Sequence, residues 1–339
     1  MTPRDLFIKA VEPSLGVPAG ELTIHCQGFR PGFRSSSRVL FGEVEAEIVS
    51  ASEDRIIVRL PESPNALGVS LSIADGVSPV FQFALATRLA SGLHPVSNPA
   101  IASDGSMITT ISGSRGQQVT QPLVRITPGG ERIPFACEIM NPTGLAFDKG
   151  GQLYISSRHE GAVYRYRDYE QLELVADDLG IACGIAFDSE GNLFVGDRSG
   201  RIIKVAPSGE KEEFASLEPS ISAYHLAMDA SDCLYVTGPT FSLRDPLVRI
   251  TPDGRKEVVL EGLARPQGMA LSPEGDILLA ASWKGKKGIF KISPKTRKIV
   301  HHITGPMLVG IAILGRRLVL ADNTSLFLIQ PGGVSAEPL

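Results

Sequence analysis

A pattern of about forty residues recurs along the last three quarters of the chain. The clearest copies are PTGLAFDKGGQLYIS from Pro142, ACGIAFDSEGNLFVG from Ala182, AYHLAMDASDCLYVT from Ala223 and PQGMALSPEGDILLA from Pro266, with weaker copies from Ser97 and Leu308. Each copy joins an apolar strand-like run to a turn, and the clear copies are 40 to 43 residues apart. A period of this size, built from short strands, predicts six four-stranded blades around a central axis.

The two ends of the repeat region predict how the ring closes. Each of the first five repeats ends in a polar strand, whereas the sixth ends at Gly333 without one. A similar segment, ATRLASGLHP from Ala86, precedes the first repeat. Placing it as the outer strand of the last blade removes two open sheet edges. We therefore expect residues 86–333 to form a six-bladed β-propeller closed by an N-terminal strand, followed by a frayed tail at 334–339.

Residues 1–85 do not share this period. They contain seven short strand-like segments, separated by Gly, Pro and Ser turns. In ELTIHCQ from Glu21, the apolar residues Leu22, Ile24 and Cys26 alternate with polar ones, as in a half-buried antiparallel strand. The pattern predicts a small β-sandwich before the propeller, in an all-β protein.

Several short motifs of this N-terminal segment follow one another in a characteristic order. They are VEPSLG from Val11, LTIHCQGF from Leu22, VLFG from Val39, RLP from Arg59 and FQF from Phe81. On these motifs, residues 1–85 resemble the IPT/TIG family, an immunoglobulin-like sandwich. The resemblance implies a spacer or contact domain. Some relatives contact DNA, but the strand turns here carry no Lys/Arg cluster, so we do not expect that role.

The repeat itself also resembles a known group. Its signature, P-x-G-h-A-h-D-x-x-G-x-L-h-h with h for apolar, resembles the six-bladed propellers of the gluconolactonase, senescence-marker-protein and luciferin-regenerating-enzyme family, and equally NHL repeats. Gluconolactonase relatives hydrolyse sugar lactones with a divalent metal at the ring axis. The resemblance implies oxygen ligands from Glu, Asn and Asp at the starts of the inner strands, which suit a hard cation.

The corresponding positions of this chain carry no carboxylate. They are Ser97, Thr143, Cys183, Tyr224, Gln267 and Val309, with Asn98, Asn141 and His225 one or two residues away. We therefore predict no metal site and no cofactor. A divalent metal, calcium or zinc, belongs only to the alternative in which the chain is a hydrolase.

A candidate axial pocket can still be assembled from Thr143, Cys183, Tyr224, His225 and Gln267. His225 replaces the repeat glycine and would offer a group that titrates near neutral pH, although a packing role is the more common outcome for such a histidine. Cys183 is either a small apolar residue or a reactive thiol. The aspartates Asp148, Asp188 and Asp229 recur in register before turns, where we expect them to accept backbone N–H bonds.

Composition excludes several classes of partner. The net charge is −4 and the isoelectric point is near 5.9. We therefore do not expect the protein to bind nucleic acid or an anionic membrane. No apolar run reaches transmembrane length, and the first residues lack a signal-peptide pattern. The scattered cysteines Cys26, Cys137, Cys183 and Cys233 suggest buried thiols and a reducing, cytoplasmic location. The segments Arg158-His159-Glu160 and WKGKK from Trp283 are expected to be solvated hairpin tips.

The function expected from these features is binding. We expect a propeller that takes a small molecule or a protein ligand at its axis or face. The alternative is a gluconolactonase-like lactone or ester hydrolase with an altered axial site. An enzyme needs converging polar groups in a pocket that water can enter, whereas a binding protein needs only a contact surface.

Overall fold

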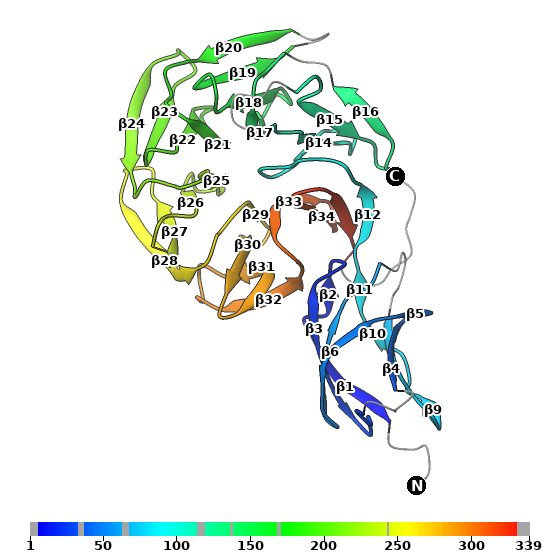
Figure 1. The fold of residues 1–339 in the computed structure, drawn as a ribbon. Coiled ribbons are helices and arrows are strands. Elements are labelled where there is room, and N and C mark those ends of the chain that lie inside the picture. Colours follow the sequence, from blue (N-terminus) through cyan, green and yellow to red (C-terminus); the bar gives the residue numbers. More distant parts are fainter. Residues whose placement is uncertain are drawn as a thin grey trace.

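The computed structural model describes residues 6–32, 37–62, 68–113, 119–135, 138–167, 171–242 and 244–330. Every regular element in this part of the chain is a β-strand, as the sequence predicts. A small sandwich of strands lies beside a ring of four-stranded sheets (Figure 1). The predicted tail at 334–339 and Cys137 fall outside the described residues. The described residues contain no helix long and apolar enough to cross a membrane.

The N-terminal sandwich consists of two sheets. One has the order β1 (Phe7–Glu12), β3 (Glu21–Gln27), β7 (Arg55–Arg59) and β6 (Glu47–Ala51). The other has the order β10 (Phe81–Gln82), β8 (Gly68–Ile73), β4 (Arg38–Phe41) and β5 (Val44–Glu45), with β9 (Gly76–Val77) paired to β8. The predicted alternation is confirmed in β3, where Leu22, Ile24 and Cys26 are fully buried between the sheets.

The ring contains six antiparallel sheets of the described residues, each with an inner, a second, a third and an outer strand. Its first three blades are β13 (Ala100–Ile101), β14 (Met107–Thr110), β15 (Leu123–Ile126), β16 (Arg132–Phe135); β17 (Pro142–Phe147), β18 (Leu153–Ser157), β19 (Ala162–Tyr166), β20 (Leu172–Ala176); and β21 (Ala182–Phe187), β22 (Leu193–Asp197), β23 (Arg201–Val205), β24 (Lys211–Ser216). The next three are β25 (His225–Met228), β26 (Leu234–Thr237), β27 (Asp245–Ile250), β28 (Lys256–Leu263); β29 (Met269–Leu271), β30 (Ile277–Trp283), β31 (Lys286–Ile292), β32 (Ile299–Thr304); and β33 (Leu308–Leu314), β34 (Arg317–Asp322), β35 (Leu326–Ile329), β12 (Thr87–Ala90).

The ring closes through β12, as predicted. This strand pairs antiparallel with β35, with Thr87 opposite Leu328 and Arg88 opposite Phe327. It supplies the outer strand of a sheet whose other three strands come from the C-terminal end of the chain (Figure 1). The closure therefore satisfies the edge of β35 that would otherwise remain open.

The recurring aspartates stabilise the turns after the inner strands. The Oδ1 atoms of Asp148, Asp188 and Asp229 each accept a backbone N–H four residues later, at 2.8–2.9 Å. This confirms the structural role predicted for them and explains their recurrence in register, because each blade makes the same turn.

The repeat glycine has a different physical reason. A Cβ atom at Gly184 would lie 2.5 Å from the carbonyl oxygen of Tyr224, and one at Gly144 would lie 2.4 Å from that of Cys183. The inner strands of neighbouring blades meet at these positions, and the N–H of Gly184 donates to the Tyr224 carbonyl at 2.9 Å. Glycine is therefore required for close approach near the axis. Of the four clear copies only the third, in the fourth blade, replaces it, with His225 in β25.

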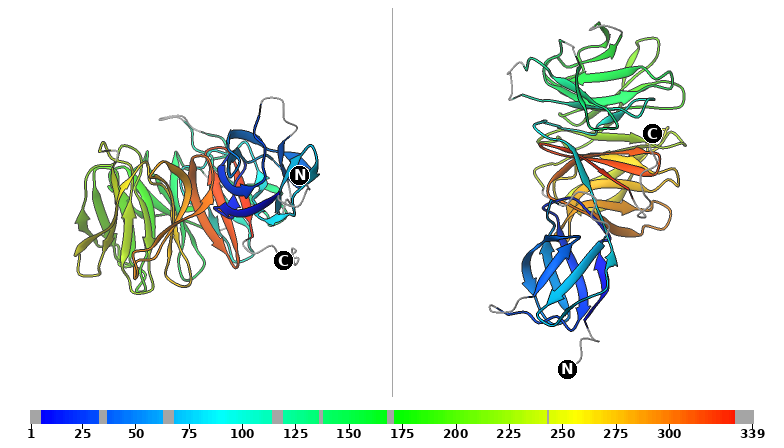
Figure 2. Two further views of the ribbon diagram at one scale, coloured as in Figure 1. Left: turned by 90° about the horizontal axis from the view of Figure 1, so that it is seen from below. Right: turned by 90° about the vertical axis from the view of Figure 1, so that its right-hand side faces the viewer.

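The sandwich is attached to the fifth blade by backbone pairing, which the sequence pattern did not predict. β2 (Leu15–Gly16) runs parallel to β32, with Leu15 opposite Ile303, and β11 (Ala84–Leu85) runs parallel to β2. Leu15 and Val17 are buried with Ile289 and Ile303 in one apolar cluster. The sandwich therefore lies against one side of the ring (Figure 2).

Candidate functional site

The starts of the inner strands mark one end of the ring. Because inner and second strands are antiparallel, the second strands end where the inner strands begin: Pro142 pairs with Ser157, Ala182 with Asp197 and His225 with Thr237. We call this end the axial face. It carries the starts of the inner strands and the loops that follow the second strands.

The five predicted pocket residues all lie at the axial face, on four successive blades. Thr143 is in β17, Cys183 in β21 and His225 in β25. Tyr224 directly precedes β25, and Gln267 lies two residues before β29. The first four of these side chains are nearly inaccessible, with 1–3% of their surface exposed, and Gln267 is half-buried. The fold brings these residues to one end of the ring, but they are packed in the contacts between blades and do not line an open pocket.

Three of the five have their polar atoms occupied within the protein. The Cys183 thiol donates to the Ile181 carbonyl at 3.2 Å. The Tyr224 hydroxyl donates to the carbonyl of Glu218, and burial raises the pKa of this phenol above its usual range. The Thr143 hydroxyl donates to the carbonyl of Asn141 at 3.3 Å. The Tyr224 and Thr143 side chains therefore stabilise the connection into their inner strand.

His225 is a buried, neutral imidazole. Burial lowers its pKa from the ordinary value of 6.5 to about 4, and an interaction with the Gln267 side chain opposes this decrease. Its Nε2 atom has no hydrogen-bond partner among the described residues, and the same holds for the buried Oδ1 of Asn141. The axial face therefore covers neutral polar atoms whose hydrogen-bonding capacity is left unused.

Cys183 is not an activated nucleophile. Burial raises the pKa of its thiol to about 11, so the thiol is protonated at neutral pH. The guanidinium groups of Arg158 and Arg198 act electrostatically on this thiol and oppose the increase. Two positive charges from neighbouring blades therefore lie near Cys183.

These arginines occupy equivalent positions, one repeat apart, directly after the second strands of the second and third blades. The backbone N–H of Arg158 donates to Asn141 at 3.3 Å, and that of Arg198 donates to Ile181 at 3.1 Å. Arg158 Nη2 reaches Ser112 Oγ at 3.0 Å, and Arg198 Nε donates to the Ser220 carbonyl at 3.1 Å. Both arginine side chains are half-buried. The predicted hairpin tip is present, with His159 and Glu160 exposed, but Arg158 is turned into contacts with its neighbours.

Neither arginine has a carboxylate partner among the described residues. The nearest candidate in sequence, Asp197, is fully engaged elsewhere. Its carboxylate accepts from Arg201 Nη2 at 2.8 Å, from the Ser199 hydroxyl and from the N–H of Ile181. The two guanidinium charges at the axial face are therefore left without local compensation.

A cavity of about 510 Å³ opens on the axial face between the third and fourth blades. Its lining includes Arg198, the paired side chains of Asp197 and Arg201, and Ile181, Ser199 and Ser220. The Ser220 hydroxyl donates to the carbonyl of Pro239 at 2.9 Å, which joins the cavity wall to the loop after β26. The ring of Phe241 in this loop is 85% exposed. The loop is anchored because the backbone and the hydroxyl of Thr240 both bind Asp245 Oδ1 at 2.7 Å.

The axial face does not fit a divalent cation. The unused buried atoms there are the His225 imidazole nitrogen, the Asn141 amide oxygen and a single carboxylate oxygen, Oδ2 of Asp245. The charged groups that act on Cys183 are the Asp197 carboxylate and the two guanidinium groups. In the part of the chain that the structure describes, no three His, Cys, Asp or Glu side chains gather in a way that could hold a metal ion. Arginines are instead suited to carboxylate or phosphate groups, which they bind through paired N–H donors.

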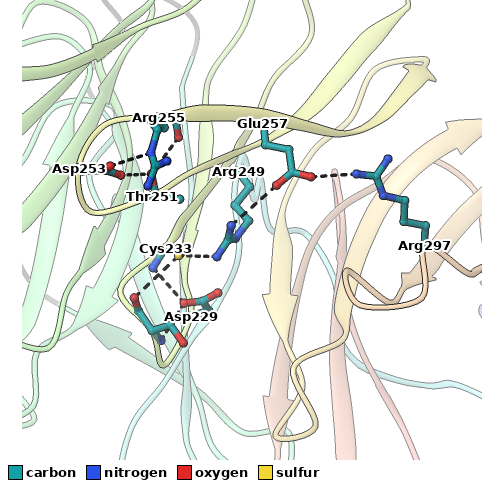
Figure 3. Close-up of polar contacts among 9 residues, drawn as sticks. Asp229, Cys233, Arg249, Thr251, Asp253, Arg255, Glu257 and Arg297 are labelled. Carbon is teal, nitrogen blue, oxygen red and sulfur yellow. Dashed lines mark hydrogen bonds and ion pairs between the residues drawn. The ribbon is translucent and has the colours of Figure 1, made fainter.

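The opposite end of the ring contains arginines that are paired. Arg249 Nη2 donates to the Cys233 sulfur at 2.8 Å, and Arg249 lies 3.8 Å from Glu257 (Figure 3). Arg297 binds the other oxygen of Glu257 at 2.9 Å. These groups line a cavity of about 440 Å³ between the fourth and fifth blades. Its positive charge is largely balanced by Glu257, so this region is better explained as a stabilising network.

The sequence pattern did not indicate Arg158 and Arg198 as candidate binding residues. It assigned Arg158 to a hairpin tip and did not single out Arg198. A signal was present, because both residues follow the second strand and are separated by one repeat. Side-chain pairing, which decides between a structural and a binding arginine, was not visible in the sequence.

A comparison with protein families assigns the N-terminal region. Residues 6–84 match the IPT/TIG domain. This segment is an IPT/TIG domain. The β1-β3-β7-β6 and β10-β8-β4-β5 sheets described above are its two layers. No curated protein matches the sequence.

Solved structures resemble the chain in fold. A protein described as a candidate gluconolactonase aligns with a TM-score of 0.58 at 17% identity, over 73% of this chain and 92% of its own. An auxiliary nutrient binding protein from Bacteroides thetaiotaomicron aligns with a TM-score of 0.58 at 10% identity, over 96% and 98% of the two chains. A catalytically inactive histidine-to-alanine variant of virginiamycin B lyase from Staphylococcus aureus, in complex with quinupristin, gives 0.53 at 15% identity, over 89% and 98%. The second alignment spans both the IPT/TIG domain and the propeller.

Proposed function

We propose that this protein binds a small anionic molecule at the axial face of its propeller, without a metal ion. The observation that carries the proposal is the pair of equivalent arginines, Arg158 and Arg198, which lack carboxylate partners among the described residues. Their guanidinium groups would bind a carboxylate or phosphate. The serine hydroxyls of the neighbouring cavity and the exposed Phe241 ring would contact the rest of the molecule.

The structural relatives support binding in general terms. Two structurally similar proteins from Bacteroides are described as auxiliary nutrient binding proteins, and both align over 96% of this chain. Their identities of 10–11% concern the fold, so the ligand class proposed here rests on the residues of this chain.

The alternative function, a lactone or ester hydrolase, has less support from the same residues. A thiol with a pKa of about 11 supplies little thiolate at neutral pH, and the Nε2 atom of His225 is enclosed. The axial donors also do not fit the divalent cation that the gluconolactonase resemblance implies. Binding without hydrolysis therefore accounts better for the site.

Isothermal titration calorimetry with gluconate, a small sugar carboxylate, tests the proposal. We expect binding in the presence of a chelator, and we expect Arg198→Gln to weaken it about tenfold, the loss of one charged contact. Arg255→Gln is the matched control, because Arg255 is a largely exposed arginine of the fourth blade that pairs with Asp253. Gluconate binding that requires calcium, or hydrolysis of glucono-δ-lactone by the protein, would contradict the proposal and favour the hydrolase.

A further inference from the structure

A second cavity lies between the IPT/TIG domain and the fifth blade, at the same end of the ring as the axial face but on the outer side of the fifth blade. Its volume is about 480 Å³, within the size range of small-molecule sites. One wall is the outer face of the β1-β3-β7-β6 sheet, and the other is formed by the β30–β31 hairpin tip with the end of β32. We call it the interdomain groove.

The two walls of the interdomain groove are held in fixed relation. The N–H of Val17 donates to the Thr304 carbonyl at 2.8 Å, and the Thr304 hydroxyl donates to the Glu21 carbonyl at 2.6 Å. At Gly20, an added Cβ would lie 2.9 Å from the backbone of Gly305. Together with the β2–β32 pairing, these contacts form a floor to the groove. Binding there would cost little ordering, because both walls are already in place.

The domain wall presents charges of both signs. The Glu21 and Arg59 backbones are opposite each other in the β3–β7 pairing, but Arg59 binds Glu47 at 2.6 Å. Glu12 and Glu21 form no ion pair among the described residues, and neither does Arg55 at the other end of β7. All three side chains are exposed to the groove. Two carboxylates and one guanidinium are therefore available on this wall.

The blade wall adds positive charge. Lys286 and Lys287 are exposed and have no ion pair among the described residues. His301 lies beside them, and its Nε2 is 2.9 Å from the Lys287 carbonyl. Burial lowers the pKa of His301, so the ring is neutral at pH 7 and donates through Nε2, which leaves Nδ1 as an acceptor. Three unpaired cations therefore share the groove with two unpaired carboxylates.

We propose that the interdomain groove binds a small zwitterion of the amino acid or short peptide class. The carboxylate of such a ligand would be bound by Arg55, Lys286 and Lys287, and its ammonium group by Glu12 and Glu21. A dianion would meet the two glutamates and a dication would meet the three basic side chains, so a ligand of either kind is disfavoured. This site shares no residue with the Arg158 and Arg198 site or its neighbouring cavity, and it does not depend on the function proposed there.

Ligand-observed NMR with the full-length protein tests this inference, with triglycine as the zwitterionic probe. Succinate and 1,4-diaminobutane are the dianionic and dicationic controls. We expect triglycine to bind at least about tenfold more tightly than either control. We also expect Glu21→Gln and Lys287→Met each to weaken triglycine binding about tenfold, because each removes one of the two charge contacts.

Two further variants locate the effect. Lys298→Met removes an exposed lysine near the opposite end of β32 and should leave triglycine binding unchanged. Arg198→Gln should also leave it unchanged, which separates this site from the site proposed at Arg158 and Arg198. The inference would be overturned if triglycine did not bind, or if the Glu21→Gln and Lys287→Met variants bound it as tightly as the wild-type protein. Tighter binding of succinate than of triglycine would also overturn it.

Discussion

The two ends of the propeller both contain arginines but use them differently. At the end drawn in Figure 3, Arg249 contacts Cys233 and Glu257, and Arg297 shares the same glutamate. At the axial face, Arg201 is paired with Asp197, but Arg158 and Arg198 contact only hydroxyl and carbonyl oxygens among the described residues. The type of residue is the same, and the difference is whether a carboxylate of the protein neutralises it.

This difference shows how a repeat fold can separate stability from binding. Paired charges on adjacent strands hold neighbouring blades together. A guanidinium group without a carboxylate partner remains free to form a charge-assisted hydrogen bond with a ligand. The axial face also differs in what lies beneath it. There, His225, Cys183 and Tyr224 are buried and uncharged at neutral pH, so the two unpaired arginines lie near uncharged side chains.

The largest expected effect concerns the charge state beneath the axial face. Because the pKa of His225 is about 4 in the folded protein and 6.5 ordinarily, the unfolded chain takes up a proton at higher pH. The free energy of unfolding should therefore be at its full value above about pH 6.5 and should fall as the pH decreases toward 4. A shift of this size corresponds to about 3 kcal/mol.

Urea unfolding of the wild type and of His225→Gln measures this effect. The glutamine does not titrate, so the variant should lack this part of the pH dependence. Burial also lowers the pKa values of His301 and His302, but these residues titrate in both proteins and cancel in the difference. Identical pH profiles would mean that His225 is charged or solvated, and the contrast between the two ends would lose its basis.

A smaller effect separates the arginines themselves. Arg249→Gln removes the hydrogen bond to Cys233 and the ion pair with Glu257 from a side chain that is 29% exposed, so we expect a loss of about 1 kcal/mol in the free energy of unfolding. Arg198→Gln should cost about half as much or less, because it removes one hydrogen bond to a carbonyl. Chemical denaturation of both variants measures the difference. A larger cost for Arg198 would assign it a structural role and weaken the proposed site.

Much of the fold could be predicted because its determinants repeat. The period, the turn aspartates and the unpaired segment from Ala86 indicated blades and their closure, and the pairing of β12 with β35 follows that prediction. The alternation in β3 likewise indicated the sandwich. The docking of β2 and β11 on β32 could not be anticipated, because two-residue parallel strands leave no periodic pattern.

The candidate site was harder to predict for a related reason. The sequence indicated that Thr143, Cys183, Tyr224, His225 and Gln267 share one end of the ring, and the structure places them there. Their exposure depends on how closely the inner strands approach, which is set by glycines such as Gly184 and by the packing of whole blades. Whether Arg198 has a carboxylate partner depends on the rotamers of Asp197 and Arg201, which no spacing rule reports.

The most direct test of the axial face is to locate an anion on it. Crystals of the protein soaked in selenate, with data collected at the selenium absorption edge, would show where a small oxyanion binds. The account predicts an anomalous peak within hydrogen-bonding distance of the Arg158 or Arg198 guanidinium, and its loss in Arg158→Gln/Arg198→Gln. A peak confined to other arginines, or a divalent cation bound at the starts of the inner strands, would contradict it.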